Sequence, residues 1–261
     1  MARILSLANQ KGGVGKTTTA VNLAASLAAA EKRVLLFDAD PQSNATSGLG
    51  QRAGPGELTS YHVLTGQAPA ASATRSTALG HLFLVPASRD LSGAEVELVT
   101  ANRREFRLRE ALAPVRQEYD YILVDCPPSL GLLTINALVA SDAVIIPLQC
   151  EYYALEGLSQ LLHTVRTVKR GFNPRLEIEG ILLTMFDPRN NLSHQVADEV
   201  KRHFKDKVFR SVIPRNVRLS ESPSHGKPAL LYDIRSSGAQ GYLRMARELI
   251  RPAAPQPPVA A

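Results

Sequence analysis

The sequence predicts an α/β fold with a doubly wound, mainly parallel sheet and helices on both of its faces. Short apolar runs of strand length alternate along the chain with longer patterns in which apolar residues recur every three or four positions. The short runs are almost continuously apolar, as in strands that are covered on both faces. Regular alternation of strand and helix is typical of βαβ units, which build parallel sheets.

Seven runs are expected to be strands, and three patterns are expected to be helices that cover them. The expected strands are residues 4–8, 33–38, 81–86, 121–125, 143–147, 178–184 and 208–213. Helical spacing is clearest in residues 20–27, 155–165 and 196–204. Residues 50–80 are rich in Gly, Ala, Pro, Ser and Thr and are expected to form loops around a short helix at 61–64.

Residues 1–251 are expected to form one domain. A chain of 261 residues with 44% hydrophobic and 21% charged residues is large enough to bury a substantial core. Residues 252–261 contain four prolines and are expected to be a disordered tail.

Composition excludes several classes of protein. Cys126 and Cys150 are the two cysteines, too few for a disulfide framework and without the spacing of a zinc site. No apolar run is suited to a signal peptide or long enough to cross a bilayer, so a cytoplasmic protein is expected.

The charge is unevenly distributed along the chain. Residues 1–165 carry 13 Lys and Arg against 15 Asp and Glu, whereas residues 166–261 carry 17 against 9. A polyanionic partner for the C-terminal part and an ordinary solvated surface both account for this excess.

A glycine-rich segment, Gly12-Gly13-Val14-Gly15-Lys16-Thr17-Thr18, follows the first expected strand and opens the first expected helix. Glycines let backbone amides approach a phosphate chain, and the helix N-terminus adds positive potential. Lys16 is expected to reach the β- and γ-phosphates and the Thr17 hydroxyl to ligate Mg²⁺. We therefore predict a nucleotide-binding phosphate loop.

A second lysine, Lys11, precedes this segment, and position 10 is Gln where the usual pattern has Gly. One interpretation is a surface lysine. The other is a lysine that crosses to the phosphates of a facing subunit, which would make dimerisation depend on the nucleotide.

Carboxylates follow two further expected strands, at the sheet edge where ligands of parallel sheets bind. Asp125 is expected to hold Mg²⁺ through water. Of Asp38 and Asp40, one is expected to help order the metal through water and the other to orient the attacking water. A single Asp at a strand end is more often a turn former, but carboxylates beside a phosphate loop favour a site for metal-assisted phosphoryl transfer.

Five blocks in order resemble one family. Residues 11–18 resemble the deviant Walker A box, with its signature lysine, of the ParA/MinD superfamily of P-loop NTPases. Residues 38–48 resemble the switch segment of chromosomal ParA proteins of the Soj type, except that Ser43 stands where many members have Gly, a departure that we expect to be tolerated. The remaining blocks are 125–129, 151–157 and 212–221, and the resemblance runs from about residue 2 to residue 249.

The resemblance implies an ATPase that partitions bacterial chromosomes or plasmids. ATP would close two subunits face to face, with Lys11 reaching the phosphates across the dimer. The dimer would bind nucleoid DNA without sequence preference and would not bind membrane. A ParB/Spo0J-like protein would stimulate hydrolysis and release the dimer. Since no residue is an obvious arginine finger, unaided hydrolysis is expected to be slow.

The resemblance also assigns residues to roles. Lys11, Lys16 and Asp40 are catalytic, with Asp40 positioning the hydrolytic water, and Asp125 is the Walker B carboxylate. Residues 11–18 bind ATP and Mg²⁺ together. Residues where relatives hold the adenine are Met185, Pro214 and Asn216.

Three arginines, Arg189, Arg215 and Arg218, resemble those that family members use on DNA. Phosphate contacts from two-fold-related patches would give sequence-independent, salt-sensitive affinity. The charged residues interpreted as an ordinary exposed helix face are Lys201, Arg202, Lys205 and Lys207.

Three alternatives share parts of this pattern. A MinD-like membrane ATPase would end in an amphipathic helix on lipid, for which residues 243–250 have a suitable pattern, although prolines follow at once. An iron–sulfur protein would need more cysteine ligands than this chain has. A metabolic ligase, such as a dethiobiotin synthetase, would leave the arginine-rich block 214–218 without a purpose.

Overall fold

The centre of the molecule is a seven-stranded sheet, seen in a computed structural model that describes residues 1–151 and 154–251. Its strands lie in the order β3-β4-β2-β5-β1-β6-β7, and only the β3–β4 pair is antiparallel. The strand bounds are β1 Arg3–Leu7, β2 Val34–Asp38, β3 Arg75–Ser76, β4 Leu82–Val85, β5 Tyr121–Asp125, β6 Ala143–Gln149 and β7 Glu177–Thr184.

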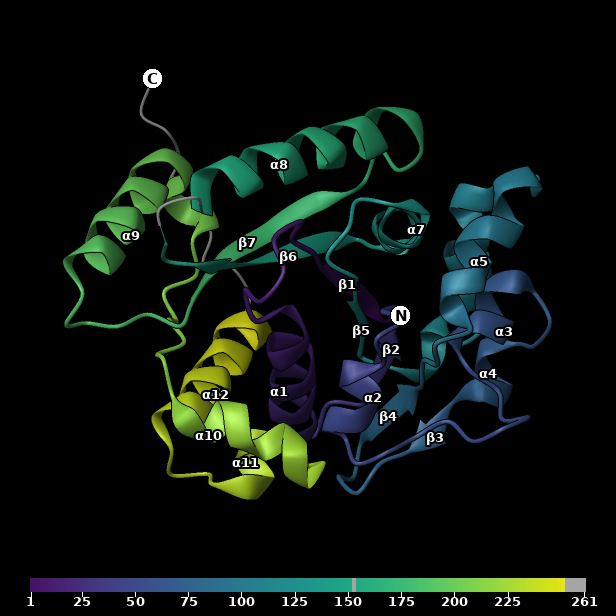
Figure 1. Ribbon diagram of the computed structural model, residues 1–261, viewed down its shortest axis with the longest axis horizontal. Helices are drawn as coiled ribbons and strands as arrows, with labels where there is room; N and C mark the ends of the chain where they lie inside the picture. The colour runs from purple at the N-terminus through teal and green to yellow at the C-terminus, as the bar shows by residue number, and fades with distance from the viewer. Residues whose placement is uncertain (152–153, 252–261) are drawn as a thin grey trace.

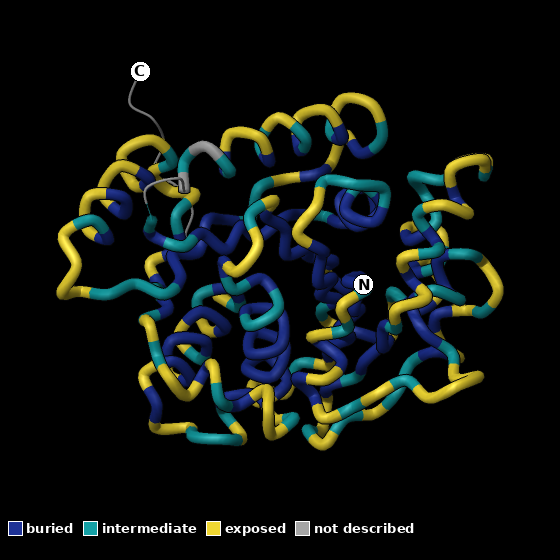
Figure 2. Tube along the Cα trace, in the orientation of Figure 1, coloured by how far each residue is buried: buried dark blue, intermediate teal, exposed yellow. Residues whose placement is uncertain are grey.

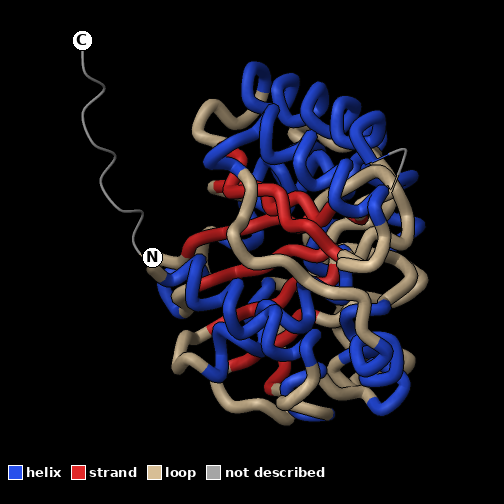
Figure 3. The backbone as a smooth tube through the Cα atoms, turned by 90° about the vertical axis from the view of Figure 1, so that its left-hand side faces the viewer, coloured by secondary structure: helices blue, strands red, loops and turns tan. Residues whose placement is uncertain are grey.

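Helices cover both faces of this sheet (Figures 1 and 3). The α-helices are α1 Lys16–Ala29, α2 Asn44–Gly48, α3 Ser60–Thr65, α4 Ala70–Ala73, α5 Leu91–Glu97, α6 Arg107–Leu112, α7 Leu132–Ala140, α8 Ala154–Gly171, α9 Asn191–Phe204, α10 Val217–Glu221, α11 Ala229–Tyr232 and α12 Ser237–Ile250. The 3-10 helices are η1 Leu98–Thr100, η2 Arg104–Phe106, η3 Arg116–Glu118, η4 Lys205–Lys207 and η5 Ser222–His225.

Two hydrophobic cores lie on opposite faces of the sheet, because side chains alternate along each strand. On one face, Leu5 and Leu7 of β1 pack with α1, α2, α11 and α12. On the other face, Ile4 packs in a core with residues of α3 to α9. Figure 2 shows the strands and α1 as the most buried elements, with α8 and α9 exposed along their outer sides. The predicted doubly wound fold is confirmed.

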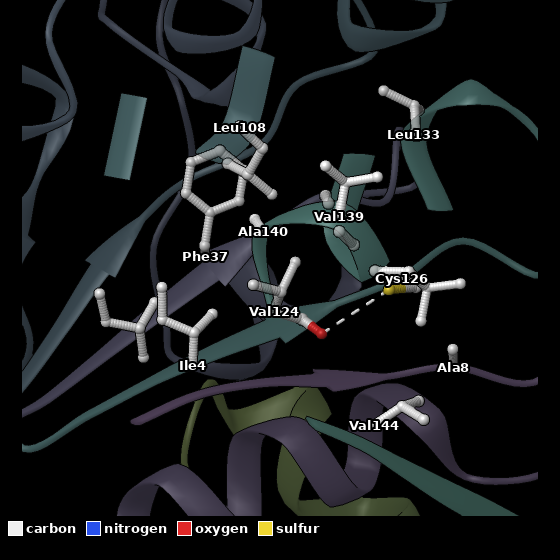
Figure 4. Packing of buried hydrophobic residues seen from close by; sticks show 14 of the residues in the cluster. Ile4, Ala8, Phe37, Leu108, Val124, Cys126, Leu133, Val139, Ala140 and Val144 are labelled. Atoms are coloured by element: carbon white, nitrogen blue, oxygen red, sulfur yellow. Dashed lines mark hydrogen bonds between the residues drawn. The ribbon is translucent and has the colours of Figure 1, made fainter. Parts of the chain in front are cut away.

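The core around α7 contains one of the two cysteines. Cys126 is fully buried among apolar side chains, and its thiol donates a weak hydrogen bond to the Val124 carbonyl at 3.8 Å (Figure 4). Burial raises the pKa of the Cys126 thiol, so this side chain stays protonated and behaves as a small hydrophobe.

Six of the seven expected strands form, but the strand expected at 208–213 is wrong. This segment hydrogen-bonds to β7 only near its two ends, where the amides of Phe209 and Ile213 donate to β7 carbonyls. Between these points, the amides of Arg210 and Ser211 donate to the Glu248 carboxylate of α12 at 2.7 and 2.9 Å. A side chain thus takes the donors that a continuous ladder would need.

The segment expected to be loops, 50–80, contains more structure than its composition indicated. The short helix expected at 61–64 is α3, but α4 and the two-residue edge strand β3 were not anticipated. Both are shorter than the windows in which periodicity can be recognised. The expected tail, 252–261, lies outside the described residues.

Helix α12 closes the face of the sheet that carries α1. The Tyr242 hydroxyl and the Thr19 hydroxyl are 3.1 Å apart in the core, and Met245 and Leu249 are buried beside them. In the described part of the chain, no helix combines the length and the apolar character that crossing a membrane requires.

Candidate nucleotide-binding site

The predicted phosphate loop, residues 11–18, lies between the carboxyl end of β1 and the start of α1. Gly13 and Gly15 have φ angles of 73° and 85°, in the left-handed region that favours glycine. Gly15 is also the N-cap of α1, so the first free amides of the helix point into the loop. The loop is fixed from β7, because the Thr184 hydroxyl donates to the Val14 carbonyl at 2.8 Å.

Lys16 is buried inside this loop. Only 6% of the residue is exposed, and Nζ donates to the Lys11 carbonyl at 3.1 Å. Burial lowers the pKa of the Lys16 ammonium, while the charge of Asp125 opposes this shift. An ammonium that donates to only one backbone carbonyl has further N–H groups available to donate to phosphate oxygens.

Asp125 is the least satisfied polar group of the site. Its two carboxylate oxygens are buried and accept no hydrogen bond of good geometry among the described residues, although the nearby Thr17 hydroxyl acts to lower the pKa of Asp125. Burial raises the pKa of Asp125 well above its ordinary value, and Asp38, which pairs with it in register across β2 and β5, raises it further. A cation beside this carboxylate would supply the missing partner, so the residues fit a Mg²⁺ ion held from Thr17 and Asp125.

Asp38 has a different environment, although it is equally buried. It accepts hydrogen bonds from the Thr46 amide at 2.9 Å, the Thr46 hydroxyl at 2.6 Å and the Asp40 amide at 3.1 Å. Burial raises its pKa to about 6, against the effect of the Thr46 hydrogen bonds. Asp38 therefore fixes α2 to the end of β2. Its expected role in ordering the metal stays a prediction.

Asp40 lies at the mouth of the same loop and is 5% exposed. One of its oxygens accepts from the Gln42 amide at 2.9 Å, and its charge acts on the Lys16 ammonium. This places Asp40 beside the phosphate loop, as its expected role with the hydrolytic water requires.

Lys11 is held within its own chain. Its Nζ atom lies 3.0 Å from Glu151 Oε2, and its amide donates to the Asn9 side chain at 3.0 Å. The Glu151 carboxylate also accepts from the Gln149 side chain. The block that carries Glu151 continues through Tyr152 and Tyr153, which lie outside the described residues.

A cavity of about 280 Å³ adjoins the phosphate loop. The three residues expected near adenine line it together with Gly15 and Thr18. These residues are Met185, Pro214 and Asn216. Asn216 is also the N-cap of α10, where it accepts from the Arg218 amide at 3.1 Å and donates to Ser237 at 2.9 Å. The volume of the cavity and its mixture of polar and apolar lining residues suit a purine base.

The three arginines predicted to contact DNA are exposed, and Arg215 lies in the lining of the cavity. A backbone bridge between Phe186 and Pro214 brings the segments of Arg189 and Arg215 together. Arg189 forms hydrogen bonds to Asp187 at 3.0 and 2.9 Å. Arg218 pairs with Glu221 at 2.7 Å and Asp233 at 3.4 Å. The four basic residues expected to be exposed around α9 are exposed.

Sequence reasoning missed three supporting residues of the site. Thr184 holds the phosphate loop, Thr46 holds α2, and Glu151 holds Lys11. Glu151 begins one of the blocks that carry the family resemblance, which was the one signal available for it. Thr46 likewise lies within the resembling block 38–48, whereas Thr184 lies in no such block and acts through a contact that only folding creates.

The sheet order and the loop between β1 and α1 define a phosphate-loop nucleotide-binding protein, and Lys11 marks the deviant Walker A class. The model of the AAA domain family matches residues 2–178. The chromosome partitioning protein ParA of Myxococcus xanthus is 60% identical over 258 residues, which are 99% of this chain and 91% of that protein. The sporulation initiation inhibitor protein Soj of Bacillus subtilis is 60% identical over 249 residues, which are 95% of this chain and 98% of that protein. The chain therefore belongs to the ParA/Soj family of chromosome-partitioning proteins.

One solved structure extends the comparison to bound ligands. The crystal structure of cobyrinic acid a,c-diamide synthase from Mycobacterium smegmatis with bound ADP and magnesium matches with a TM-score of 0.85 at 38% identity. The match covers 96% of this chain and 95% of that chain.

Proposed function

We propose that this protein is an ATP- and Mg²⁺-dependent partitioning ATPase whose ATP-bound dimer binds DNA. The observation that supports this most is the unpartnered Asp125 carboxylate beside the buried Lys16 ammonium. The phosphate loop that carries Lys16 also lines, through Gly15 and Thr18, a cavity that suits a purine base. The similar synthase structure with ADP and magnesium supports the same ligands, and the 60% identity to ParA and Soj favours partitioning over synthase chemistry.

Each group of residues in the site would have a separate role in ATP hydrolysis. The amides of residues 12–18 and the Lys16 ammonium would bind the phosphates, while Met185, Pro214 and Asn216 hold the base. Thr17 and Asp125 would hold Mg²⁺, which neutralises charge on the phosphate oxygens. Asp40 would accept a hydrogen bond from the attacking water and align it with the γ-phosphate.

Dimerisation would follow from ATP binding through Lys11. In the single chain, Glu151 is the partner of Lys11, and the ammonium is about one third exposed. An ATP-bound second subunit would offer the more strongly charged γ-phosphate. Lys11 would then leave Glu151 and contact the phosphate across the dimer interface.

The dimer would present two copies of the arginine surface formed by Arg189, Arg215 and Arg218. Contacts from exposed arginines to DNA phosphates carry no sequence information and depend strongly on salt. Doubling the surface raises its affinity by multivalency, so DNA binding would be much tighter for the dimer. A ParB/Spo0J-like partner would stimulate hydrolysis and release the dimer from the nucleoid.

The arrangement of α12 favours DNA over a membrane as the surface that is bound. Its apolar side, including Met245 and Leu249, packs against α1 in the core. A helix whose apolar side is already buried has none left to insert into lipid. We therefore propose a cytoplasmic, nucleoid-associated protein.

The decisive experiment measures DNA affinity with ATP, with ADP and without nucleotide, alongside dimerisation by analytical ultracentrifugation. We expect wild type to dimerise and bind DNA only with ATP. Lys16→Ala should do neither, and Asp40→Ala should remain on DNA because turnover fails. Arg218→Glu should still bind ATP but lose DNA.

The matched control is Arg166→Glu, an equal charge change at an exposed position of α8. We expect it to behave as wild type. Equal DNA affinity in all three nucleotide states, or an unchanged mass in protein proven to hold ATP, would contradict the proposal. Phosphate release with DNA should rise when the ParB-type partner is added.

A further inference from the structure

Two glycines that are 176 positions apart in the chain touch through their backbones. Gly50 follows α2, Gly226 follows η5, and their φ angles are 71° and 61°. A Cβ atom at Gly226 would lie 2.5 Å from Gly50 Cα, and a Cβ at Gly50 would lie 2.8 Å from the Gly226 carbonyl oxygen. Neither position can accept a side chain without a shift of the backbone.

On one side of this contact lies a segment that is hydrogen-bonded to a carboxylate of the nucleotide site. Residues 38–50 begin at the buried Asp38, which fixes α2 through its two hydrogen bonds to Thr46. The amide of Gly50 donates to the Ser47 carbonyl at 2.9 Å. Gly50 therefore moves with α2, and α2 is anchored at the carboxylates of the phosphate site.

On the other side lies the helical run that carries Arg218. Helix α10 passes directly into η5, and Gly226 is the residue that ends η5. The amide of Gly226 donates to the Pro223 carbonyl at 3.0 Å. Figure 1 shows α2 next to this run, which it contacts at η5. The run begins at Val217, which lines the base cavity together with Asn216.

A second cavity, of about 250 Å³, separates α2 from η5 and the start of α1. Thr17, Ser47 and Ser222 are among its lining residues. This space leaves room for a displacement of α2 toward η5. The Gly50–Gly226 contact has no such space, so a displacement of α2 toward η5 is passed on instead of being absorbed.

We propose that Gly50 and Gly226 are positioning residues that couple the nucleotide site to the arginine surface within one subunit. When the phosphate site fills, α2 shifts, and the contact moves the α10–η5 run and with it Arg218. The inference rests on the proposed function and adds to it a second source of ATP-dependent DNA affinity, which does not require dimerisation.

The test compares Gly226→Ala and Gly50→Ala with Gly66→Ala and Gly56→Ala. All four glycines have φ between 61° and 79°, but a Cβ at Gly66 or Gly56 meets nothing within 4 Å. The control variants therefore have the same backbone strain without the contact. ATP affinity, dimer affinity and the ratio of DNA affinities with ATP and with ADP are measured for each protein.

Gly226→Ala and Gly50→Ala should bind ATP and dimerise within about twofold of wild type. Their ratio of DNA affinities with ATP and ADP should fall at least about fivefold. Gly66→Ala and Gly56→Ala should keep the wild-type ratio. A folded Gly226→Ala protein with a wild-type ratio would overturn the coupling.

A measurement on wild type covers the case in which the variants do not fold. Hydrogen exchange of residues 217–226 is compared with ATP and with ADP, at a concentration where sedimentation shows monomer. We expect ATP to change exchange there at least about threefold, and identical exchange overturns the coupling. If wild type shows no ATP-dependent DNA binding at all, the proposed function itself fails, whatever the exchange result.

Discussion

Lys11 Nζ lies 3.0 Å from Glu151 Oε2 of the same chain, although Lys11 occupies the position of the lysine that marks this class. Both side chains are partly exposed, at 35% and 46%. An ion pair of this kind contributes roughly 0.2–1 kcal/mol. The contact is therefore strong enough to orient Lys11 in the monomer and weak enough to be exchanged for a phosphate.

Replacing Glu151 with Gln should favour the ATP-bound dimer. The variant removes the charge that competes for Lys11, so we expect up to about fivefold tighter ATP-dependent dimerisation. Sedimentation at several protein concentrations measures this effect. Glu177→Gln, which removes the exposed partner of Lys169, is the matched control. Weaker dimerisation of the Glu151→Gln protein would show that Glu151 has another role at the interface.

The stability of the nucleotide-free protein should fall as pH rises. The pKa of Asp125 is raised by burial, and that of Asp38 is raised to about 6, so the folded protein holds protons that the unfolded chain releases. The stability that these two groups contribute is fully present below about pH 4, the unfolded-chain pKa, and is lost as pH rises through their folded-state pKa values. Thermal unfolding between pH 5 and pH 8 measures this decline.

Asp125→Asn should remove much of that decline. Without nucleotide, we expect the variant to be about 1–3 kcal/mol more stable than wild type at pH 8, because a buried unpartnered charge has gone. Mg²⁺ and ATP should reverse the order, since they stabilise only the protein that binds them well. Asp198→Asn, at an exposed position of α9, should leave the pH dependence unchanged. An Asp125→Asn protein that is less stable than wild type at pH 8 without nucleotide is the contrary outcome.

Ser43→Gly should stabilise the protein. Ser43 has φ 50° and ψ 33°, a left-handed conformation that costs a residue with a Cβ about 1 kcal/mol relative to glycine. This conformation explains why glycine is expected here in the family. We expect a gain of about 0.5–1 kcal/mol in urea unfolding. Ser47→Gly, inside α2, should instead lose about the same amount, and a loss at both positions would contradict the argument.

Asp187→Asn should tighten DNA binding in the ATP state. Hydrogen bonds from Arg189 hold the pKa of Asp187 down to about 2, so the guanidinium is engaged within its own loop. Asparagine keeps an acceptor for the Arg189 amide but removes the charge. We expect about two- to tenfold higher affinity and an unchanged salt slope.

Arg189→Gln should lower both the affinity and the salt slope, the slope by about one for each phosphate contact that is lost. Asp90→Asn, at an exposed position before α5, controls for net charge. Equal effects of Asp187→Asn and Asp90→Asn would mean that Arg189 does not contact DNA.

The fold could be predicted because its main signals are local. Each strand of the parallel core is a short run of apolar residues, and β2 is buried along its whole length. The phosphate loop was equally accessible, since its glycines, lysine and threonines are consecutive in the chain. The three residues expected near adenine also proved to line one cavity.

The remaining features depend on residues that are distant in sequence. The run at 208–213 is apolar enough for a strand, yet Glu248 takes two of its amides. The hydrogen bond from Thr184 to Val14 joins residues 170 positions apart. The contact between Gly50 and Gly226 cannot be recognised from composition or spacing. It depends on the close approach of two backbones that are distant in sequence, which only glycine permits.

The packing of α12 against α1 has a consequence for synthesis of the protein on the ribosome. Helix α1 emerges early, but the part of its surface that packs against α12 is not covered until residues 237–250 have also been made. The nascent chain therefore exposes an apolar surface for most of translation, the condition under which a chaperone is needed to prevent aggregation. The cavity that adjoins the phosphate loop is likewise incomplete until Pro214 and Asn216 have been made.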